Sequence, residues 1–170
     1  MNSRQIPVVG LALIVVSCSQ PTPIQDPGIE NPDLSIKLTS LPEGLAVTTN
    51  QGSTLELGPD DESTVGRIWF VVGPEKENVN LVAAVQDHQA QIESLPDGTY
   101  KGAQELQGDF GAAFYSRGRF SDDGAQVEET VLFLIHPAGT RLLEIHYRYP
   151  AGTDSAARVE QLIGVLAELE

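Results

Sequence analysis

The sequence is poor in the residues from which most metal, redox and nucleophilic sites are built. Its 170 residues include one cysteine, Cys18, and three histidines, His88, His136 and His146. A single cysteine excludes an intrachain disulfide and a C-x-x-C pair, and the sequence contains no G-x-S-x-G elbow, glycine-rich phosphate loop or EF-hand spacing. We therefore expect no enzymatic activity, no cofactor and no bound metal, and a fold that depends on its hydrophobic core.

Basic residues are also scarce. The chain has 10 Lys and Arg residues against 24 Asp and Glu residues, for a formal charge of −14 at pH 7. Such a surface repels nucleic-acid phosphates and anionic lipid headgroups. Electrostatics therefore favours neither nucleic acid nor a membrane surface as a partner, and any membrane attachment would have to come from a covalent lipid.

No apolar run is long enough to span a bilayer. The longest, residues 6–16, is far shorter than the roughly 20 residues that a spanning helix needs. The run follows Arg4, and a basic residue followed by a short apolar segment is typical of an export signal. The segment ends in Val-Val-Ser-Cys at residues 15–18, which fills the four positions of a Leu/Val–x–small–Cys pattern and resembles a bacterial lipobox.

This resemblance implies that residues 1–17 are a lipoprotein signal peptide and that Cys18 is lipidated. The cysteine would carry a diacylglycerol and an acyl chain such as palmitate, and two or more chains anchor a protein stably. The mature protein would be exported and lipid-anchored in the bacterial cell envelope. The outer membrane is favoured in a Gram-negative cell, because Ser19 does not resemble the Asp that retains lipoproteins in the inner membrane. An ordinary signal peptide followed by a chance cysteine is the alternative.

A proline-rich segment separates this signal from the rest of the chain. Residues 18–33 contain four prolines and few apolar side chains, so they predict an extended tether. Residues 34–170 then predict a single domain, a length that can bury a sizeable core.

Apolar periodicity predicts the secondary structure of this domain. Apolar residues recur every three or four positions in residues 78–95 and 155–169, which is typical of amphipathic helices. The candidate N-caps are Asn78 or Asn80 for the first helix and Thr153 or Asp154 for the second. Strands are predicted at residues 34–38, 45–49, 54–57, 67–72, 100–106, 111–120, 126–135 and 142–149.

Two turns predict how the last three strands pair. Asp123-Gly124 is a two-residue hairpin signal, and placing it in the turn pairs Ser121 with Gln126. A second turn at residues 137–140 pairs Glu129 with Arg148. The four strands between residues 100 and 149 should therefore form an antiparallel meander.

Both faces of this meander are apolar, and so are both faces of the strand at residues 67–72. We expect that strand to be covered on both sides, with Trp69 filling the core. The two predicted helices would cover one face each. The predicted fold class is therefore α+β, an antiparallel β-sheet meander flanked by helices on both faces.

The order of elements carries a family resemblance. An LPEG turn at residues 41–44, a short hairpin, a helix and a meander are followed by YRYPAGTDSAARVEQLIGVLAEL at residues 147–169. This order resembles the PsbP-like α/β/α sandwich family, which includes a nuclear Ran-binding protein and DcrB/LpqN-type lipoproteins. The resemblance covers residues 34–170 and implies a non-enzymatic binding or accessory role. The resemblance rests on the order of elements and not on a diagnostic motif, so it assigns no function to any individual residue.

Four polar side chains form the candidate contact site for a ligand or partner. Glu144, His146 and Arg148 alternate along one strand and so share a face, and the predicted register places Glu129 beside Arg148. Carboxylates beside a histidine can bind a cation or move protons. The favoured interpretation is nevertheless a solvated sheet margin with a structural Glu129–Arg148 cross-strand pair. His88, on the apolar stripe of the first helix, is expected to be a core or rim histidine with one satisfied nitrogen.

Three classes of function remain open at this point. The favoured one is a membrane-anchored, non-catalytic binding or accessory module for another envelope component. Its partners would be the lipid bilayer, through Cys18, and an envelope protein, but not nucleic acid. The alternative is a carrier of a small ligand or cation that uses the sheet margin. A hydrolase ranks below both, because no nucleophile has a recognisable setting.

Overall fold

The computed structural model of the protein describes residues 28–60, 66–108 and 110–170. Cys18, the predicted signal peptide and most of the predicted tether lie outside these residues. In the described ranges, neither helix is long and apolar enough to cross a membrane.

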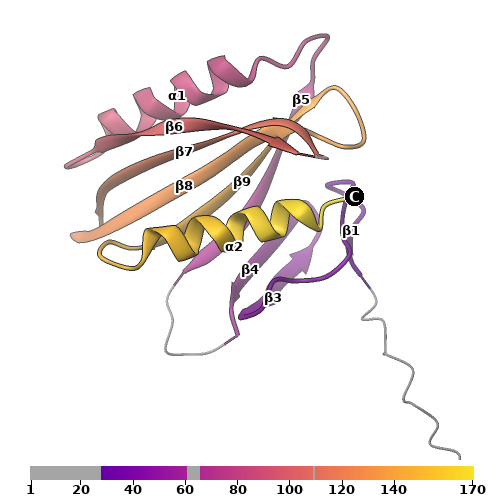
Figure 1. The fold of residues 1–170 in the computed structure, drawn as a ribbon, viewed down its shortest axis with the longest axis horizontal. Coiled ribbons are helices and arrows are strands. Elements are labelled where there is room, and N and C mark those ends of the chain that lie inside the picture. The colour runs from indigo at the N-terminus through magenta and orange to yellow at the C-terminus, as the bar shows by residue number, and fades with distance from the viewer. Residues whose placement is uncertain (1–27, 61–65, 109) are drawn as a thin grey trace, which may run out of the picture.

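The described residues form strands and two helices in an order close to the predicted one (Figure 1). The strands are β1 (Ile29–Asn31), β2 (Ile36–Leu38), β3 (Leu45–Gln51), β4 (Thr54–Pro59), β5 (Arg67–Glu75), β6 (Thr99–Gly108), β7 (Gly111–Asp122), β8 (Ala125–Ile135) and β9 (Arg141–Pro150). The helices are α1 (Leu81–Ser94) and α2 (Ser155–Ala167).

Both helices begin at a side-chain cap that the sequence predicts. The Oδ1 atom of Asn80 accepts a hydrogen bond from the Ala83 N–H at 3.0 Å. The Oδ1 atom of Asp154 accepts from the N–H groups of Ala156 and Ala157 at 3.1 and 3.4 Å. These bonds satisfy backbone donors that a helix leaves unpaired in its first turn.

Seven strands form one antiparallel sheet in the order β3-β4-β5-β9-β8-β7-β6, and β1 and β2 pair separately. The predicted meander register is confirmed at both turns, since Ser121 pairs with Gln126 and Glu129 pairs with Arg148. Strand β9 also pairs with β5, which joins the meander to the strands that precede α1.

Strand β1 lies inside residues 18–33, which the sequence analysis assigns to the tether. The buried side chain of Asn31 anchors it. Its Nδ2 donates to Asn50 Oδ1 at 2.8 Å and to the Gly52 carbonyl at 3.0 Å, and its Oδ1 accepts from the Leu34 N–H at 2.9 Å. The packed part of the chain therefore begins before residue 34.

One face of the sheet is covered by α2 together with the β1–β2 hairpin. Leu162 and Leu166 of α2 share a buried cluster with Leu132 and Leu134 of β8. The hairpin region contributes Leu34, Ile36 and Leu38 to the same cluster.

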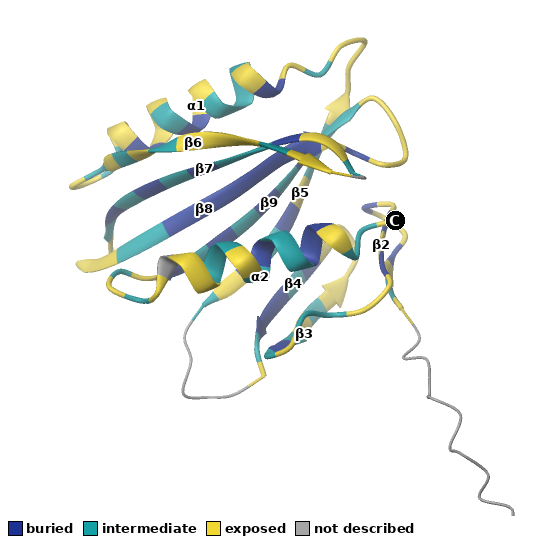
Figure 2. Cartoon of the chain, viewed as in Figure 1, coloured by how far each residue is buried: buried dark blue, intermediate teal, exposed yellow. Residues whose placement is uncertain are grey.

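Helix α1 packs on the intervening residues of the meander. Leu81 lies in a second buried cluster with Val131 and Phe133 of β8, so consecutive residues of β8 contact different helices. Figure 2 shows the resulting buried run along β8. A Cβ atom at Gly118 of β7 would lie 2.6 Å from Ile92 Cγ1, so the glycine lets α1 approach the sheet closely.

Helix α1 lies over β6, β7 and β8, and the neighbouring part of the same sheet face on β5 and β9 stays open. Val71 of β5 is 40% exposed and Trp69 is only partly buried. The prediction that residues 67–72 are covered on both sides is therefore wrong, as is the placement of Trp69 in the core. Arginines, not a helix, lie over this side of β5. We call the surface formed by Arg67, Trp69, Val71, Glu144 and His146 the open face.

Candidate functional site

The candidate site is centred on Glu129, where α1 passes over the middle of the meander. Glu129 is only 3% exposed. Strand β9 supplies Arg148 directly opposite it, and α1 supplies His88. The prediction of a solvated sheet margin is therefore wrong for Glu129, which α1 covers. The strand pattern alone does not show where a helix packs on the sheet.

Arg148 holds one oxygen of the Glu129 carboxylate. Its Nε and Nη2 atoms lie 2.9 and 2.8 Å from Glu129 Oε2, which confirms the predicted cross-strand pair. Its Nη1 atom donates to Asp122 Oδ2 at 2.9 Å. Burial alone would raise the pKa of the Glu129 carboxyl, but His146, His88 and Arg148 outweigh burial and hold that pKa well below its usual value. Glu129 is therefore a buried anion at neutral pH.

Two imidazole rings lie beside the other oxygen of Glu129. His88 Nε2 is 3.7 Å and His146 Nδ1 is 3.6 Å from Glu129 Oε1, and neither nitrogen has a hydrogen-bond partner among the described residues. His88 Nδ1 lies 2.8 Å from the Ser116 hydroxyl. The prediction of a core histidine with one satisfied nitrogen is thus confirmed for His88.

His146 connects the buried cluster to the open face. Its Nε2 atom lies 3.1 Å from Glu144 Oε2, and its ring stacks on Trp69 with 4.8 Å between centroids and 12° between planes. Burial lowers the pKa of His146, but the carboxylates of Glu129 and Glu144 raise it by more, so the pKa lies above its usual value. The guanidinium groups of Arg67 and Arg148 lie 4.8 and 5.4 Å from the Trp69 ring centroid, which gives cation–π contacts.

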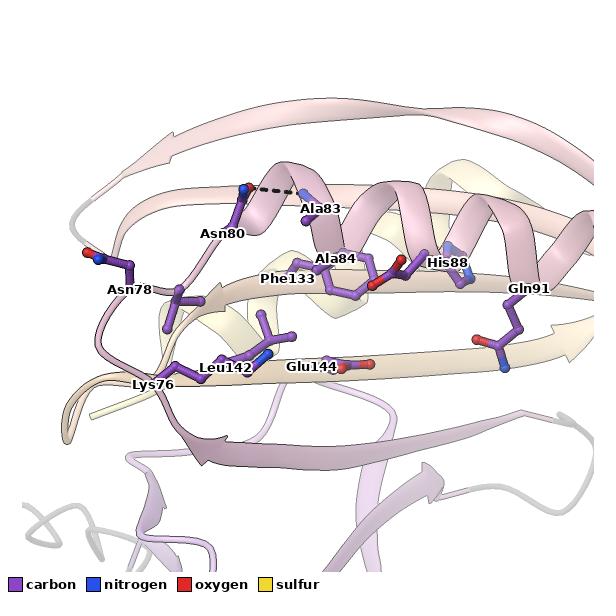
Figure 3. A pocket seen from close by; sticks show the side chains of 12 residues that line it. Lys76, Asn78, Asn80, Ala83, Ala84, His88, Gln91, Phe133, Leu142 and Glu144 are labelled. Carbon is purple, nitrogen blue, oxygen red and sulfur yellow. Dashed lines mark hydrogen bonds between the residues drawn. The ribbon is translucent and has the colours of Figure 1, made fainter.

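A crevice of about 230 Å³ runs between α1 and the strands next to this cluster (Figure 3). Phe133, Leu142 and Glu144 form its floor, and α1 lines it with small and polar side chains that include Asp87 and His88. The crevice therefore combines the apolar side chains of Phe133 and Leu142 with the carboxylates of Glu144 and Asp87, a lining suited to a side chain or a small molecule.

The order Ser116, His88, Glu129 is that of a Ser-His-acid triad, but the geometry does not make Ser116 a nucleophile. Ser116 is 0% exposed, and its hydroxyl also donates to Tyr100 Oη at 3.2 Å. A nucleophilic serine has to reach a substrate carbonyl held beside an oxyanion hole. No substrate can approach a hydroxyl that is fully enclosed.

The same cluster can be tested as a cation site. In the described ranges, no three His, Cys, Asp or Glu side chains gather closely enough to hold a metal ion. The cluster offers instead a set of hydrogen-bonding and ionisable groups beside a partly buried aromatic ring.

The structure brings together all four residues that the sequence singles out, and it adds His88, Ser116 and Trp69. The four were found because alternation and hairpin register are local properties of the chain. The added residues depend on where α1 and β5 lie against the meander. The only sequence signal for them is the position of His88 on the apolar stripe of its helix, which indicates that His88 faces the sheet.

Comparisons with known proteins show the fold. No family model matches the sequence, and no curated protein matches it. The structure is similar to that of the Saccharomyces cerevisiae Ran-binding protein Mog1p, with a TM-score of 0.55 and 12% identity over 79% of this chain and 89% of that one. A mutant of Mog1 gives a TM-score of 0.51 at 13% identity over the same shares. LpqN of Mycobacterium tuberculosis, described as involved in cell envelope biogenesis, matches at 15% identity and a TM-score of 0.47 over 82% of each chain. The predicted resemblance to a family that includes a nuclear Ran-binding protein is therefore confirmed at the level of the fold.

Proposed function

We propose that this protein is an exported lipoprotein, anchored through Cys18, whose domain is a non-catalytic binding or accessory module for another protein of the cell envelope. The lipobox-like residues 15–18 support the anchor. The open face beside α1 carries the proposal of binding, since no helix covers it and it presents a partly buried aromatic ring and an exposed valine in the middle of the sheet.

The composition of the open face suits protein recognition. Tryptophan and arginine are among the residues most enriched at positions that dominate binding free energy, and Arg67 and Arg148 both lie over the Trp69 ring. Val71 extends the apolar surface along β5, and Glu144 adds a charged edge. The crevice beside α1 gives the surface a recess into which a partner side chain fits.

The surface can be tested by photo-crosslinking in cells. A benzoylphenylalanine at position 71 should give one adduct of discrete mass. The same amino acid at position 82, where the valine on the outer side of α1 is 54% exposed, should not give it. The captured protein should bind the purified domain, and Val71→Glu should weaken that binding at least about tenfold, because the charge loses hydration against an apolar partner surface. Identical adducts from both positions would contradict the proposal.

Replacing Cys18 with alanine tests the anchor. The Cys18→Ala protein should accumulate as an unprocessed precursor without a lipid, because no thiol remains to accept the diacylglycerol. Immunoblots of membrane and soluble fractions, with palmitate labelling, measure both effects, and Ser17→Ala keeps a small residue before the cysteine and serves as the control. Mature-sized Cys18→Ala protein in the membrane fraction would contradict the lipoprotein assignment.

The crevice favours a second candidate function, the carrier of a small ligand. Its volume and its apolar floor suit a small molecule with a polar or cationic group that reaches Asp87 or Glu144. A melting-temperature screen of the purified domain against small amines and metabolites tests this alternative. A ligand whose stabilising effect is lost in Glu144→Gln would support a carrier in place of a protein-binding module.

A further inference from the structure

Two basic side chains that have no partner in the described ranges lie together on β6 and β7. Most Lys and Arg side chains of these ranges form an ion pair or donate a hydrogen bond, but no such contact joins Lys101 or Arg117 to another described residue. Both side chains line a cavity of about 200 Å³ that Tyr149 also lines, and we call it the basic cavity. Acidic residues outnumber basic ones by 24 to 10 in this chain, so two adjacent basic residues without an acidic partner require an explanation.

A β-bulge brings Lys101 to the same side of the sheet as Arg117. The pairing of β6 with β7 shifts by one residue between Tyr100 and Gly102, so Lys101 and Gly102 together lie opposite Arg117. Gly102 has a φ of 107°, a conformation that favours glycine. The next residue of β7, Gly118, faces α1, so Arg117 points to the other side of the sheet. On that side α2 packs on β9, and β6 and β7 lie beyond it (Figure 1).

The two glutamates that line the basic cavity do not neutralise its cations. Glu128 is already paired with Arg119. Glu129 is held by Arg148 and lies beside His88 of α1, so its carboxylate belongs to the opposite face of the sheet. The basic cavity therefore keeps the positive charge of its lysine and its arginine.

Protection of the sheet edge explains Lys101 but not Arg117. Strand β6 is the last strand of the sheet, and a lysine or a bulge on an edge strand commonly prevents pairing with another chain. Arg117 lies one strand further in and is half-buried. A guanidinium carries several N–H donors, and removing them from water without supplying acceptors costs free energy. An anion in the basic cavity supplies those acceptors.

We propose that the basic cavity is a binding site for one phosphate group. The planar fork of Arg117 holds two of the phosphate oxygens, and Lys101 adds a second positive charge as a compact ammonium group. A doubly charged phosphate matches two unpaired cations, whereas a single carboxylate leaves one of them unpaired. A cavity of about 200 Å³ admits a phosphate group with a few attached atoms, but it is smaller than the roughly 300–1,000 Å³ of sites for drug-sized molecules.

The negative net charge of the chain does not prevent this binding. Salt screens exposed charges beyond about 8–10 Å, so the cations that contact the ligand dominate its binding. The phosphate site goes beyond the proposed function and does not depend on it, because it lies on the other side of the sheet from the open face. Crosslinking at position 71 therefore tests the proposed function alone.

An NMR titration of the purified full-length protein, in a neutral detergent and at constant ionic strength, tests the site. Inorganic phosphate should shift the amide signals of Gly102, Arg117 and Gly118 in a saturable way, with a dissociation constant of about 1 mM or lower. Acetate should bind at least about tenfold more weakly, because it carries one charge. Shifts that do not saturate, or that acetate reproduces at the same concentration, would overturn the site.

Glycerol phosphate, titrated in the same way, distinguishes two sources of the phosphate group. Binding tighter than that of inorganic phosphate would support a phosphate group carried by a larger molecule such as a lipid headgroup. Weaker binding would support the free ion. Saturable binding of neither compound would contradict the proposal.

Three variants separate the site from the general charge of the surface. Arg117→Gln should weaken phosphate binding at least about tenfold, and Lys101→Gln should weaken it by less, because a lysine lacks the bidentate fork. Lys76→Gln is the matched control, since it removes the same charge but lies at the crevice beside α1, and it should leave phosphate binding unchanged. Equal weakening in Lys76→Gln and Arg117→Gln would contradict the proposal.

A stability measurement in chloride buffer distinguishes a binding role of Arg117 from a structural one. Without phosphate, Arg117→Gln should unfold at the same urea concentration as the native protein, because Arg117 has no partner in the described ranges to lose. A lower midpoint would assign Arg117 a structural role and would count against the site. If Arg117→Gln does not fold, Lys101→Gln still decides, because its side chain is exposed and unchanged phosphate binding in that variant would contradict the proposal.

Discussion

Replacing Leu162 with aspartate should unfold the domain. Leu162 lies on α2, is fully buried and contacts the core cluster that contains Leu132 and Leu134. An aspartate at this position has no partner, and burying an unpaired charge costs several kcal/mol in addition to the roughly 2–5 kcal/mol for the lost leucine side chain. The sum is comparable to the whole stability of a domain this size, about 5–15 kcal/mol. Circular dichroism during urea titration should show no cooperative transition.

The control for this variant places the same residue on the outer side of the same helix. Ala157 is exposed on α2, so Ala157→Asp should change the free energy of unfolding by less than about 0.5 kcal/mol. A Leu162→Asp protein that unfolds at the same urea concentration as Ala157→Asp would show that α2 does not contribute to the core.

The register of the meander could be predicted because short turns determine it locally. Asp123 and Gly124 both have positive φ angles, 49° and 82°, which a two-residue hairpin turn of this kind requires. Once such a turn is placed, the pairing of every residue along its two strands follows. The turn at residues 137–140 determines the next pair of strands in the same way and places Glu129 opposite Arg148. The helix caps were predictable for the same reason, since a cap involves only the first turn of its helix.

The rest of the candidate site could not be predicted, because it depends on contacts between distant elements. An apolar strand indicates burial on both faces, yet no helix covers the outer side of β5, where Arg67, Arg148 and His146 lie against Trp69. Likewise, Asn31 of β1 is buried and its side chain makes four hydrogen bonds, yet in the sequence it looks the same as a solvated loop residue. Polar side chains that become buried through long-range contacts carry no local periodic signal.

The depth of Glu129 also changes what the predicted cross-strand pair means. An exposed Glu–Arg pair contributes little to stability, so a solvated margin would tolerate the loss of either partner. A buried carboxylate depends on its counter-charges, because water cannot replace them. Because α1 covers Glu129, we expect substitutions in this cluster to lower the stability of the domain, whereas a solvated margin would tolerate them.

Replacing Arg148 with leucine should consequently destabilise the domain by about 3 kcal/mol at pH 7, because it leaves the buried Glu129 carboxylate without its guanidinium partner. The pKa of Glu129 is held below its ordinary value of 4.5 in the native protein, so its stabilising contribution is present above that pH and is lost as the pH falls through the folded-state pKa. Removing Arg148 raises the folded-state pKa, so the difference in stability between the variant and the native protein should shrink on acidification. Urea titrations at pH 7 and pH 4 measure both quantities.

Arg67→Leu is the matched control, because Arg67 also lies over Trp69 but is more exposed and reaches Glu56 only at 3.6 Å. It should cost less than about 1 kcal/mol. Adding Glu129→Gln to Arg148→Leu should restore most of the lost stability at pH 7, because a neutral amide needs no counter-charge. Equal losses in the two arginine variants, or no recovery in the double variant, would show that the stability of the domain does not depend on compensating a buried charge at Glu129. In that case the cluster would have to be interpreted again as the solvated margin that the strand pattern first indicated.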